Sequence, residues 1–402
     1  MRRVLDILLR NFIQTGILTV TFSDGSSRRY IGQNPGDEAA LEITTLKAEH
    51  AIALNPALSF GEEYMNGHVL PKNCSLRTLL HVLMQNLQNH TLVSNEIGAH
   101  LRQLMRLMQP LNSLRRSRRN VAHHYDLDGR LYSLFLDRDL QYSCAYFERE
   151  DMTLEEAQEA KKRHIAAKLC LERPGLEVLD IGCGWGGMAL TLARDYGARV
   201  TGITLSVEQL SVARQRAEAA GLEDRVHFEL MDYRTCKRHF DRIVSVGMFE
   251  HVGLKYYETF FLDIKRCLKP DGIALIHSIG RMDGPATTNP WIAKYIFPGG
   301  YSPALSEVFA VVEKTGLWVT DCEILRLHYA RTIEEWYRRF SQNREKIRAL
   351  YDDRFVRMFE LYLLASEQAF RVQGHMNFQI QLTPDINAVP FTRDYMFSRK
   401  GG

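Results

Sequence analysis

The stretch that decides the fold reads Val178-Leu179-Asp180-Ile181-Gly182-Cys183-Gly184-Trp185-Gly186-Gly187. Three apolar residues surround one aspartate, which is typical of the end of a buried strand, and glycines follow at once. A helical pattern then begins at Met188. A strand, a tight glycine turn and a helix N-terminus let the backbone approach a nucleotide-like ligand closely. The glycines also match the pattern G-x-G-x-x-G, but this pattern alone leaves the identity of the nucleotide open.

Strand and helix patterns alternate around this stretch. Strands are expected at 177–181, 198–203, 225–230, 241–246, 272–279, 317–324 and 376–382. Helices are expected at 186–196, 207–220, 255–268 and 304–315. The alternation predicts an α/β fold with a seven-stranded, mostly parallel, Rossmann-like sheet between helices. A helical insertion at about 332–372 separates the last two strands, and its apolar stripes are typical either of core packing or of a lid over a site.

The chain before residue 126 is organised differently. Residues 1–95 predict a small α+β domain, with a hairpin over 18–31 and one or two further strands within 40–53. Lipid binding is one role considered for this domain, since its titratable groups form no catalytic pattern. Residues 96–125 form a basic linker, and residues 126–402 form the predicted catalytic domain, which includes the helical insertion.

The linker combines arginines with apolar residues and has no acidic residue between Glu96 and Asp126. Six basic side chains lie there: Arg102, Arg106, Arg115, Arg116, Arg118 and Arg119. One interpretation is a solvated linker. The other is a surface that contacts anionic phospholipid head groups, where each basic residue contributes on the order of 1 kcal/mol.

Composition sets broad limits on the class of protein. The 402 residues are 45% hydrophobic and 25% charged, and the net charge of +3 is too small to indicate nucleic acid as a partner. Seven scattered cysteines without a C-x-x-C pair predict a reducing compartment and no metal site. No apolar run is long enough to span a membrane, and polar residues interrupt the first apolar segment. We therefore expect a cytoplasmic protein whose contact with membranes is peripheral.

The residues that follow the next two strands indicate which nucleotide is bound. A dinucleotide fold places an acid at the end of the second strand to hold ribose hydroxyls, but this chain has Thr204-Leu205-Ser206 there, followed by Gln209. The third strand ends at Asp232-Tyr233, where a carboxylate can bond an adenine amino group beside an aromatic ring. An ordinary turn aspartate is the alternative for Asp232. Together these features favour S-adenosylmethionine over NAD.

Six motifs follow one another along the catalytic region: Tyr142-Ser-Cys-Ala-Tyr146, Leu179-Asp-Ile-Gly-Cys-Gly-Trp-Gly-Gly187, Thr204-Leu-Ser-Val-Glu-Gln209, Ser245-Val-Gly-Met-Phe-Glu-His-Val-Gly253, Ile276-His-Ser-Ile-Gly280 and Lys294-Tyr-Ile-Phe-Pro-Gly-Gly300. They resemble those of cyclopropane-fatty-acyl-phospholipid synthases, which use S-adenosylmethionine to add a methylene group across the double bond of an unsaturated acyl chain. The resemblance covers about 125–400, and it implies a class I methyltransferase fold, an unsaturated phospholipid substrate in the membrane, and a homodimer. Phe147 departs from the family, where a tryptophan is common.

The resemblance also implies the roles of individual residues. A bicarbonate ion would be held by Cys144, Glu250, His277, the backbone of Ile279, and Tyr329. The S-adenosylmethionine site would comprise Tyr142, Ser143, Asp180, Gly182, Gly184, Trp185, Gly186, Thr204, Leu205, Gln209, Asp232 and Tyr233. Each of the first group also has a structural interpretation when it is taken alone: Cys144 as a small buried residue, Glu250 as a helix-start carboxylate and His277 as a core histidine.

The chemistry of the reaction explains why such residues are needed. An alkene that attacks a sulfonium methyl becomes a carbocation, so the site must exclude water and must supply a base for the proton that leaves. Aromatic faces stabilise a cation. The same site could instead give methyl-branched or methylene fatty acids. A methyltransferase for small soluble molecules and a non-catalytic lipid-binding protein are the more distant alternatives.

Overall fold

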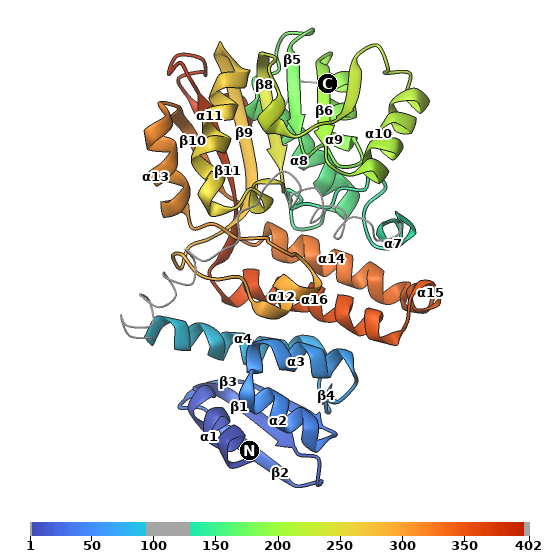
Figure 1. Cartoon of the computed structure of the whole chain (residues 1–402), viewed down its shortest axis with the longest axis vertical. Helices are drawn as coiled ribbons and strands as arrows, with labels where there is room; N and C mark the ends of the chain where they lie inside the picture. The colour runs from blue at the N-terminus through green and yellow to red at the C-terminus, as the bar shows by residue number, and fades with distance from the viewer. Residues whose placement is uncertain (1, 94–128, 398–402) are drawn as a thin grey trace. The chain divides into compact units, whose positions relative to one another are not determined.

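The computed structural model describes residues 2–93 and 129–397, which form two compact units. The first unit takes in residues 1–109, 286–298 and 330–375. The second takes in 110–285, 299–329 and 376–402. Each chain segment can be followed by colour in Figure 1. The predicted linker at 96–125, with its arginines, lies outside the described residues.

The second unit contains a seven-stranded sheet in the order β10-β11-β9-β8-β5-β6-β7. Four pairs of neighbouring strands run parallel: β5 with β6, β5 with β8, β6 with β7 and β8 with β9. Strands β10 and β11 pair antiparallel. The strands are β5 (Glu177–Ile181), β6 (Arg199–Thr204), β7 (Val226–Leu230), β8 (Phe240–Val246), β9 (Leu268–Arg281), β10 (Trp318–Ile324) and β11 (His375–Thr383). Each strand lies within a few residues of its predicted position.

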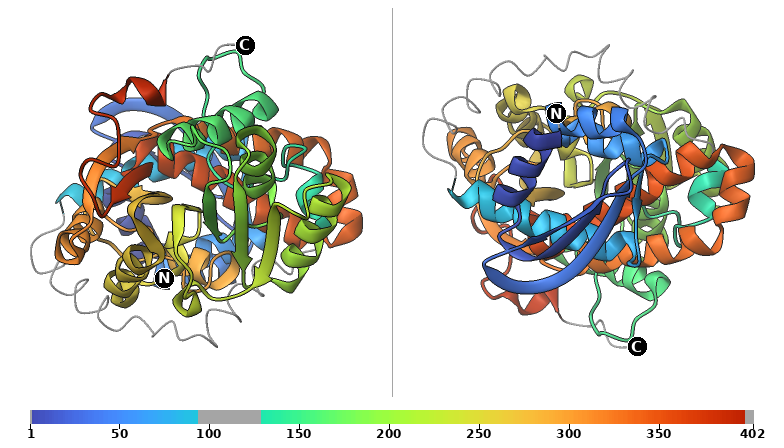
Figure 2. Two further views of the ribbon diagram at one scale, coloured as in Figure 1. Left: turned by 90° about the horizontal axis from the view of Figure 1, so that it is seen from above. Right: turned by 90° about the horizontal axis from the view of Figure 1, so that it is seen from below.

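Alternate residues of these strands enter two separate cores. Leu179 and Ile243 belong to the core that includes helices α11 and α13, whereas Val178 and Val244 belong to the core that includes α8, α9 and α10. Since successive side chains of a strand point to opposite faces, helices cover both faces of this sheet, as the views in Figure 2 allow the reader to follow. The helices are α8 (Leu154–Lys168), α9 (Gly187–Tyr196), α10 (Val207–Ala219), α11 (Tyr257–Cys267) and α13 (Leu305–Thr315). The predicted Rossmann-like fold is therefore confirmed.

The first unit contains a four-stranded sheet in the order β2-β1-β3-β4. Its strands are β1 (Thr15–Thr21), β2 (Ser27–Ile31), β3 (Asn34–Ile43) and β4 (Val69–Pro71), and its first helices are α1 (Arg2–Phe12), α2 (Leu46–Leu54), α3 (Pro56–Met65) and α4 (Leu76–Val93). The hairpin at 18–31 is confirmed. Of the one or two strands expected within 40–53, the end of β3 is present, and a helix follows because the Thr45 side chain accepts the Ala48 N–H and begins α2.

The helical insertion consists of α14 (His328–Gln342), α15 (Arg344–Leu350) and α16 (Asp353–Val372). From Ala330 onward it belongs to the first compact unit, whereas the sequence analysis placed it with the catalytic region. Helix α16 packs along α4 and α3. The Tyr64 hydroxyl donates to Glu360 at 3.1 Å, and Arg77 forms an ion pair with the buried carboxylate of Glu367 at 3.0 Å. These long-range partners are not encoded in local periodicity.

A second short insertion also belongs to the first unit. Helix α12 (Pro290–Tyr295) lies against α3, and both Lys294 and Tyr295 bond the carboxylate of Glu62. None of the helices in the described ranges is long and apolar enough to cross a bilayer.

We expect Phe260→Ala to lower the free energy of unfolding by about 3–5 kcal/mol, because truncating a fully buried ring leaves a cavity. Phe260 lies on α11 with its ring 5.1–5.3 Å from those of Tyr233, Phe249 and Phe261. Urea titration followed by circular dichroism measures the change. The control is Leu262→Ala on the same helix, where 46% of the residue is exposed and a change within about 0.5 kcal/mol is expected. Equal losses in the two variants would contradict this assignment of the core.

Candidate active site

The predicted site residues gather where the parallel strands end. Asp180 on β5 lies beside Gly202 on β6 and Val244 on β8, and Gly182 N–H donates to the carbonyl of Ile203 at 2.9 Å. Open α/β sheets bind ligands at this carboxyl edge. The register of the sheet therefore brings the glycine loop, the residues after β6 and the residues after β8 to one edge.

The glycine loop provides room for a ligand against bare backbone. Gly184 has a φ of +54°, and a side chain placed there would meet no atom within 4 Å. Gly186, with a φ of +86°, precedes the first residue of α9. Asp180 is buried, and its Oδ2 atom has no hydrogen-bond partner among the described residues. Burial raises the pKa of this carboxyl to about 7. An unpartnered polar atom beside an open glycine turn fits a polar, nucleoside-containing cofactor.

Aromatic rings join two of the predicted cofactor residues. The ring of Tyr132 lies 5.3 Å from that of Tyr142 and 4.9 Å from that of Trp185. The Trp185 indole N–H donates to Glu208 at 3.3 Å. Tyr142 and Trp185 thus share one neighbour although they are far apart in the sequence.

The residues after β6 and β7 form local hydrogen bonds. The Thr204 hydroxyl donates to Gln209 Oε1 at 3.0 Å and accepts the Ser206 N–H, and partly buried Leu205 lies between them. The Asp232 carboxylate accepts hydrogen bonds from the N–H and the guanidinium of Arg234.

Glu250 and Ile279 meet directly. Glu250 follows β8, and its Oε1 accepts the Ile279 N–H at 2.6 Å. The Ile279 backbone, predicted to help hold an anion, thus bonds Glu250, another residue of the predicted set. Glu250 Oε2 is buried and has no partner among the described residues. Burial raises the pKa of Glu250 to about 7.

His277 on β9 pairs with Val246, the last residue of β8, and lies between two amide side chains of β11. Its Nε2 is 3.0 Å from Asn377 Nδ2, and its Nδ1 is 3.1 Å from Gln379 Nε2. Burial lowers the pKa of His277 to about 3, so the imidazole is neutral. A neutral ring has one N–H and one lone pair, so one of these amides must turn its oxygen to the ring.

The remaining predicted residues with aromatic or thiol side chains, Cys144, Tyr329 and Tyr233, are buried or partly buried. Cys144 is fully buried, and its thiol donates to the Ala145 carbonyl at 3.3 Å. Tyr329 is buried in the first turn of α14. Tyr233 is half-buried with its ring against Phe260.

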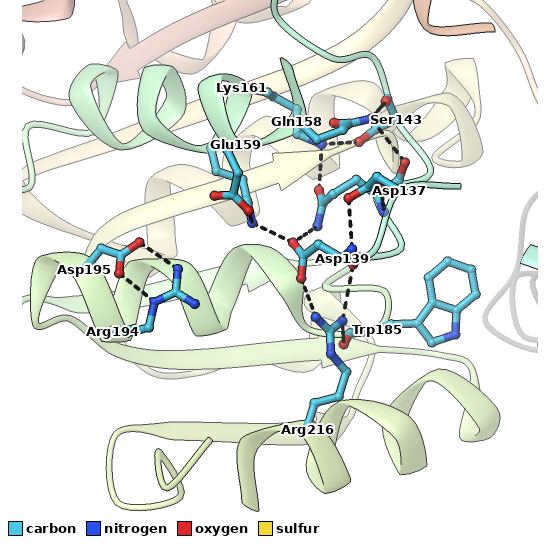
Figure 3. A network of polar contacts seen from close by, with 12 residues as sticks. Asp137, Asp139, Ser143, Gln158, Glu159, Lys161, Trp185, Arg194, Asp195 and Arg216 are labelled. Atoms are coloured by element: carbon cyan, nitrogen blue, oxygen red, sulfur yellow. Dashed lines mark hydrogen bonds and ion pairs between the residues drawn. The ribbon is translucent and has the colours of Figure 1, made fainter. Parts of the chain in front are cut away.

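The sequence analysis missed a polar cluster on α8, drawn in Figure 3. Lys161 Nζ donates to Gln141 Oε1 at 2.6 Å and to Ser143 Oγ at 2.8 Å, and Gln158 Nε2 donates to the Ser143 carbonyl at 3.0 Å. Asp139 binds Lys162 and Arg216 beside this group. The sequence does contain an indication of this cluster, because the polar residues Gln158 and Lys161 interrupt the apolar stripe formed by residues such as Ala157 and Ile165.

The raised pKa of Glu250 predicts how the free energy of unfolding changes with pH. Its native pKa of about 7 lies above the ordinary value of 4.5, so the folded state binds the extra proton and loses stability as pH rises between these values. Glu250→Gln keeps an acceptor for Ile279 and removes this dependence. We expect the variant to gain about 2–3 kcal/mol relative to the native chain between about pH 5 and pH 8. Denaturant titrations at both pH values measure this. Exposed Glu313→Gln on α13 is the control, and parallel profiles for native chain and Glu250→Gln would show the assignment to be wrong.

Known proteins are similar to this chain in sequence and in fold. The family model described as mycolic acid cyclopropane synthetase matches residues 112–380. The cyclopropane-fatty-acyl-phospholipid synthase of Escherichia coli (strain K12) is 40% identical over 360 residues, which are 88% of this chain and 90% of that protein. The tuberculostearic acid methyltransferase of Mycobacterium tuberculosis is 37% identical over 328 residues, 78% of this chain and 76% of that protein.

A solved structure gives the same result. The mycolic acid cyclopropane synthase CmaA1, complexed with SAH and CTAB, is 33% identical with a TM-score of 0.63, over 66% of this chain and 97% of that one. The chain therefore belongs to the mycolic acid cyclopropane synthetase family and is an S-adenosylmethionine-dependent methyltransferase.

Proposed function

We propose that this protein is a cyclopropane-fatty-acyl-phospholipid synthase, which transfers a methylene group from S-adenosylmethionine to the cis double bond of an unsaturated phospholipid acyl chain. The observation that carries the proposal is the 40% identity over 88% of the chain to the Escherichia coli enzyme of that name. The bond between Glu250 and the Ile279 N–H and the buried His277 support it, because His277 pairs with the last residue of β8, at the edge of the sheet where the methyl donor is expected.

The cofactor would be held by the glycine loop and the residues around it. When bound, S-adenosylmethionine supplies an electrophilic methyl group on a sulfonium. Gly184 leaves space against the backbone, and Asp180 offers an unpartnered oxygen. Tyr142, Ser143, Trp185, Thr204 and Gln209 complete our assignment from the family motifs. Asp232 and Tyr233 are assigned to the adenine end, with the Asp232 carboxylate already oriented by Arg234.

Water must be kept from the carbocation that the alkene becomes, and the chain supplies an apolar surrounding for this. Phe249 is fully buried directly before Glu250, and Tyr301 is buried and bonds the Glu250 carbonyl through its N–H at 3.0 Å. Aromatic faces stabilise positive charge without offering a nucleophile. Dry surroundings also strengthen each electrostatic contact with the reacting atoms.

Ring closure requires a base, and we assign this role to a bicarbonate ion near Cys144, Glu250, His277 and Tyr329. One feature fits an anion. Glu250 has a pKa of about 7, so it can carry a proton on Oε2 for donation to the ion. In this proposal Ile279 acts through Glu250, since its N–H holds that carboxylate in place.

The substrate places the enzyme at a membrane surface. We therefore propose a cytoplasmic protein that associates peripherally with phospholipid, and a homodimer by analogy with the relatives. A related lipid C-methyltransferase is the second candidate function. It is favoured by the 37% identity over 78% of the chain to the tuberculostearic acid methyltransferase, and it would give a methyl-branched or methylene product.

A product assay separates these two functions. We expect incubation with S-adenosylmethionine and vesicles of unsaturated phospholipid to yield upfield cyclopropyl protons in the NMR spectrum of the extracted lipid. Vinylidene or branched methyl signals without cyclopropyl protons would establish the second candidate instead. Methylation of soluble substrates alone would rule out both.

Glu250→Ala and His277→Ala should retain cofactor binding but lose turnover by about 10²–10⁴-fold, since both act on proton removal and not on the donor. Calorimetric titration with S-adenosylhomocysteine measures binding, and the lipid assay measures turnover. Glu258→Ala and His227→Ala, which remove exposed residues of the same types, are matched controls. Turnover at the native rate in either site variant would disprove the assignment.

A further inference from the structure

Helix α8 buries a lysine whose charge the described structure does not balance directly. Lys161 has no exposed surface, and its two hydrogen bonds go to neutral oxygens, those of Gln141 and Ser143. No described carboxylate forms an ion pair with it, although Asp137 and Asp139, and also Asp180, act on it over a longer range. Burying a single ammonium away from water costs on the order of several kcal/mol unless a nearby anion compensates for its charge.

The other buried lysines of the same helix are paired in the ordinary way. Lys162 contacts Asp139 and Glu159, each at 2.7 Å. Lys168 contacts Glu323 at 2.5 Å. Burial lowers the pKa of Lys161 to about 8, which leaves it charged near neutral pH. The contrast within one helix indicates that the positive charge of Lys161 is kept for something other than the fold.

Lys161 determines what the Ser143 hydroxyl can do. Because Lys161 donates to Ser143 Oγ, the O–H of Ser143 must be donated elsewhere, and the described residues give it no acceptor. Gln158, one turn earlier on α8, fixes the Ser143 backbone through its carbonyl. The serine is thus held at both ends, as Figure 3 shows. Ser143 is 9% exposed whereas Lys161 is fully buried, so of these two residues only Ser143 can contact a ligand.

The position of Ser143 is at the end of the parallel sheet. Its Cβ lies 4.0 Å from where a side chain on Gly247 would begin, and Gly247 follows β8 and donates to the His277 carbonyl. A hydroxyl that accepts a hydrogen bond from a buried ammonium keeps its own O–H free to donate to an anion.

We propose that Lys161 is a positioning residue for the carboxylate of the methyl donor, acting through the Ser143 hydroxyl. The inference rests on S-adenosylmethionine as the donor. The carboxylate is the one anionic group of that molecule, so it is the group that a donor hydroxyl with a lysine behind it would select. Lys161 orients the Ser143 hydroxyl and supplies a positive electrostatic potential, and Ser143 donates the hydrogen bond to the carboxylate.

The test compares two ligands that differ in the amino-acid end, which carries this carboxylate. Isothermal titration of the full-length protein measures binding of S-adenosylhomocysteine, which has the carboxylate, and of 5′-methylthioadenosine, which lacks the amino-acid end. For Lys161→Met we expect affinity for the first ligand to fall at least about tenfold, while affinity for the second changes less than about threefold. Ser143→Ala should show the same selectivity. Adding Lys161→Met to Ser143→Ala should have little further effect, because the two residues act as one unit.

Lys168→Met, which removes another buried lysine of α8, is the control and should not discriminate between the ligands. An equal loss for both ligands in Lys161→Met would mean a purely structural role and would overturn the proposal. So would an unchanged preference in Ser143→Ala, which remains testable if Lys161→Met does not fold. Failure of the native chain to bind either ligand would instead refute the donor itself.

Discussion

The burial of ionisable groups at the carboxyl edge of the parallel sheet is the constraint on which the rest of the catalytic unit depends. Asp180 and Glu250 both have pKa values raised to about 7, and His277 has its pKa lowered to about 3. All three shifts have burial as their largest cause, and all three favour the neutral form. A core of apolar residues would be more stable there. The fold therefore keeps a costly arrangement in which small changes of environment move a proton.

Neutral amides keep this arrangement in place. Asn377 and Gln379 hold the two nitrogens of His277, and Gln158 holds the backbone of Ser143. Amides satisfy buried partners without adding charge, so they fix geometry and leave the electrostatic field to Lys161 and to bound ligands. Each comes from an element that also packs into the core, which makes these supports rigid. Charged side chains in the same places would shift the proton equilibrium of the groups they support.

Whether the sequence predicts a feature of this fold or site depends on how far apart in the chain the interacting residues lie. Strand positions and the glycine loop follow from local pattern, because alternation and tight turns involve neighbours in the chain. The bond from Ile279 to Glu250 and the amides around His277 could not be derived in that way, because they join residues 29 to 102 positions apart. The membership of α16 in the first unit is of the same kind, since it rests on partners such as Tyr64.

Even so, β11 shows that long-range chemistry leaves a local trace. Its apolar residues Met376, Phe378 and Ile380 alternate with Asn377 and Gln379, and all of them are buried. On an exposed sheet such alternation means that one face meets water, but a strand with both faces buried has to find protein partners for the polar row. Asn377 and Gln379 of this row contact His277, so the alternating pattern predicts a polar site within the sheet. The same logic applies to Gln158 and Lys161 on α8. Polar residues in apolar stripes of buried elements are therefore the sequence feature by which the supports of such a site can be found.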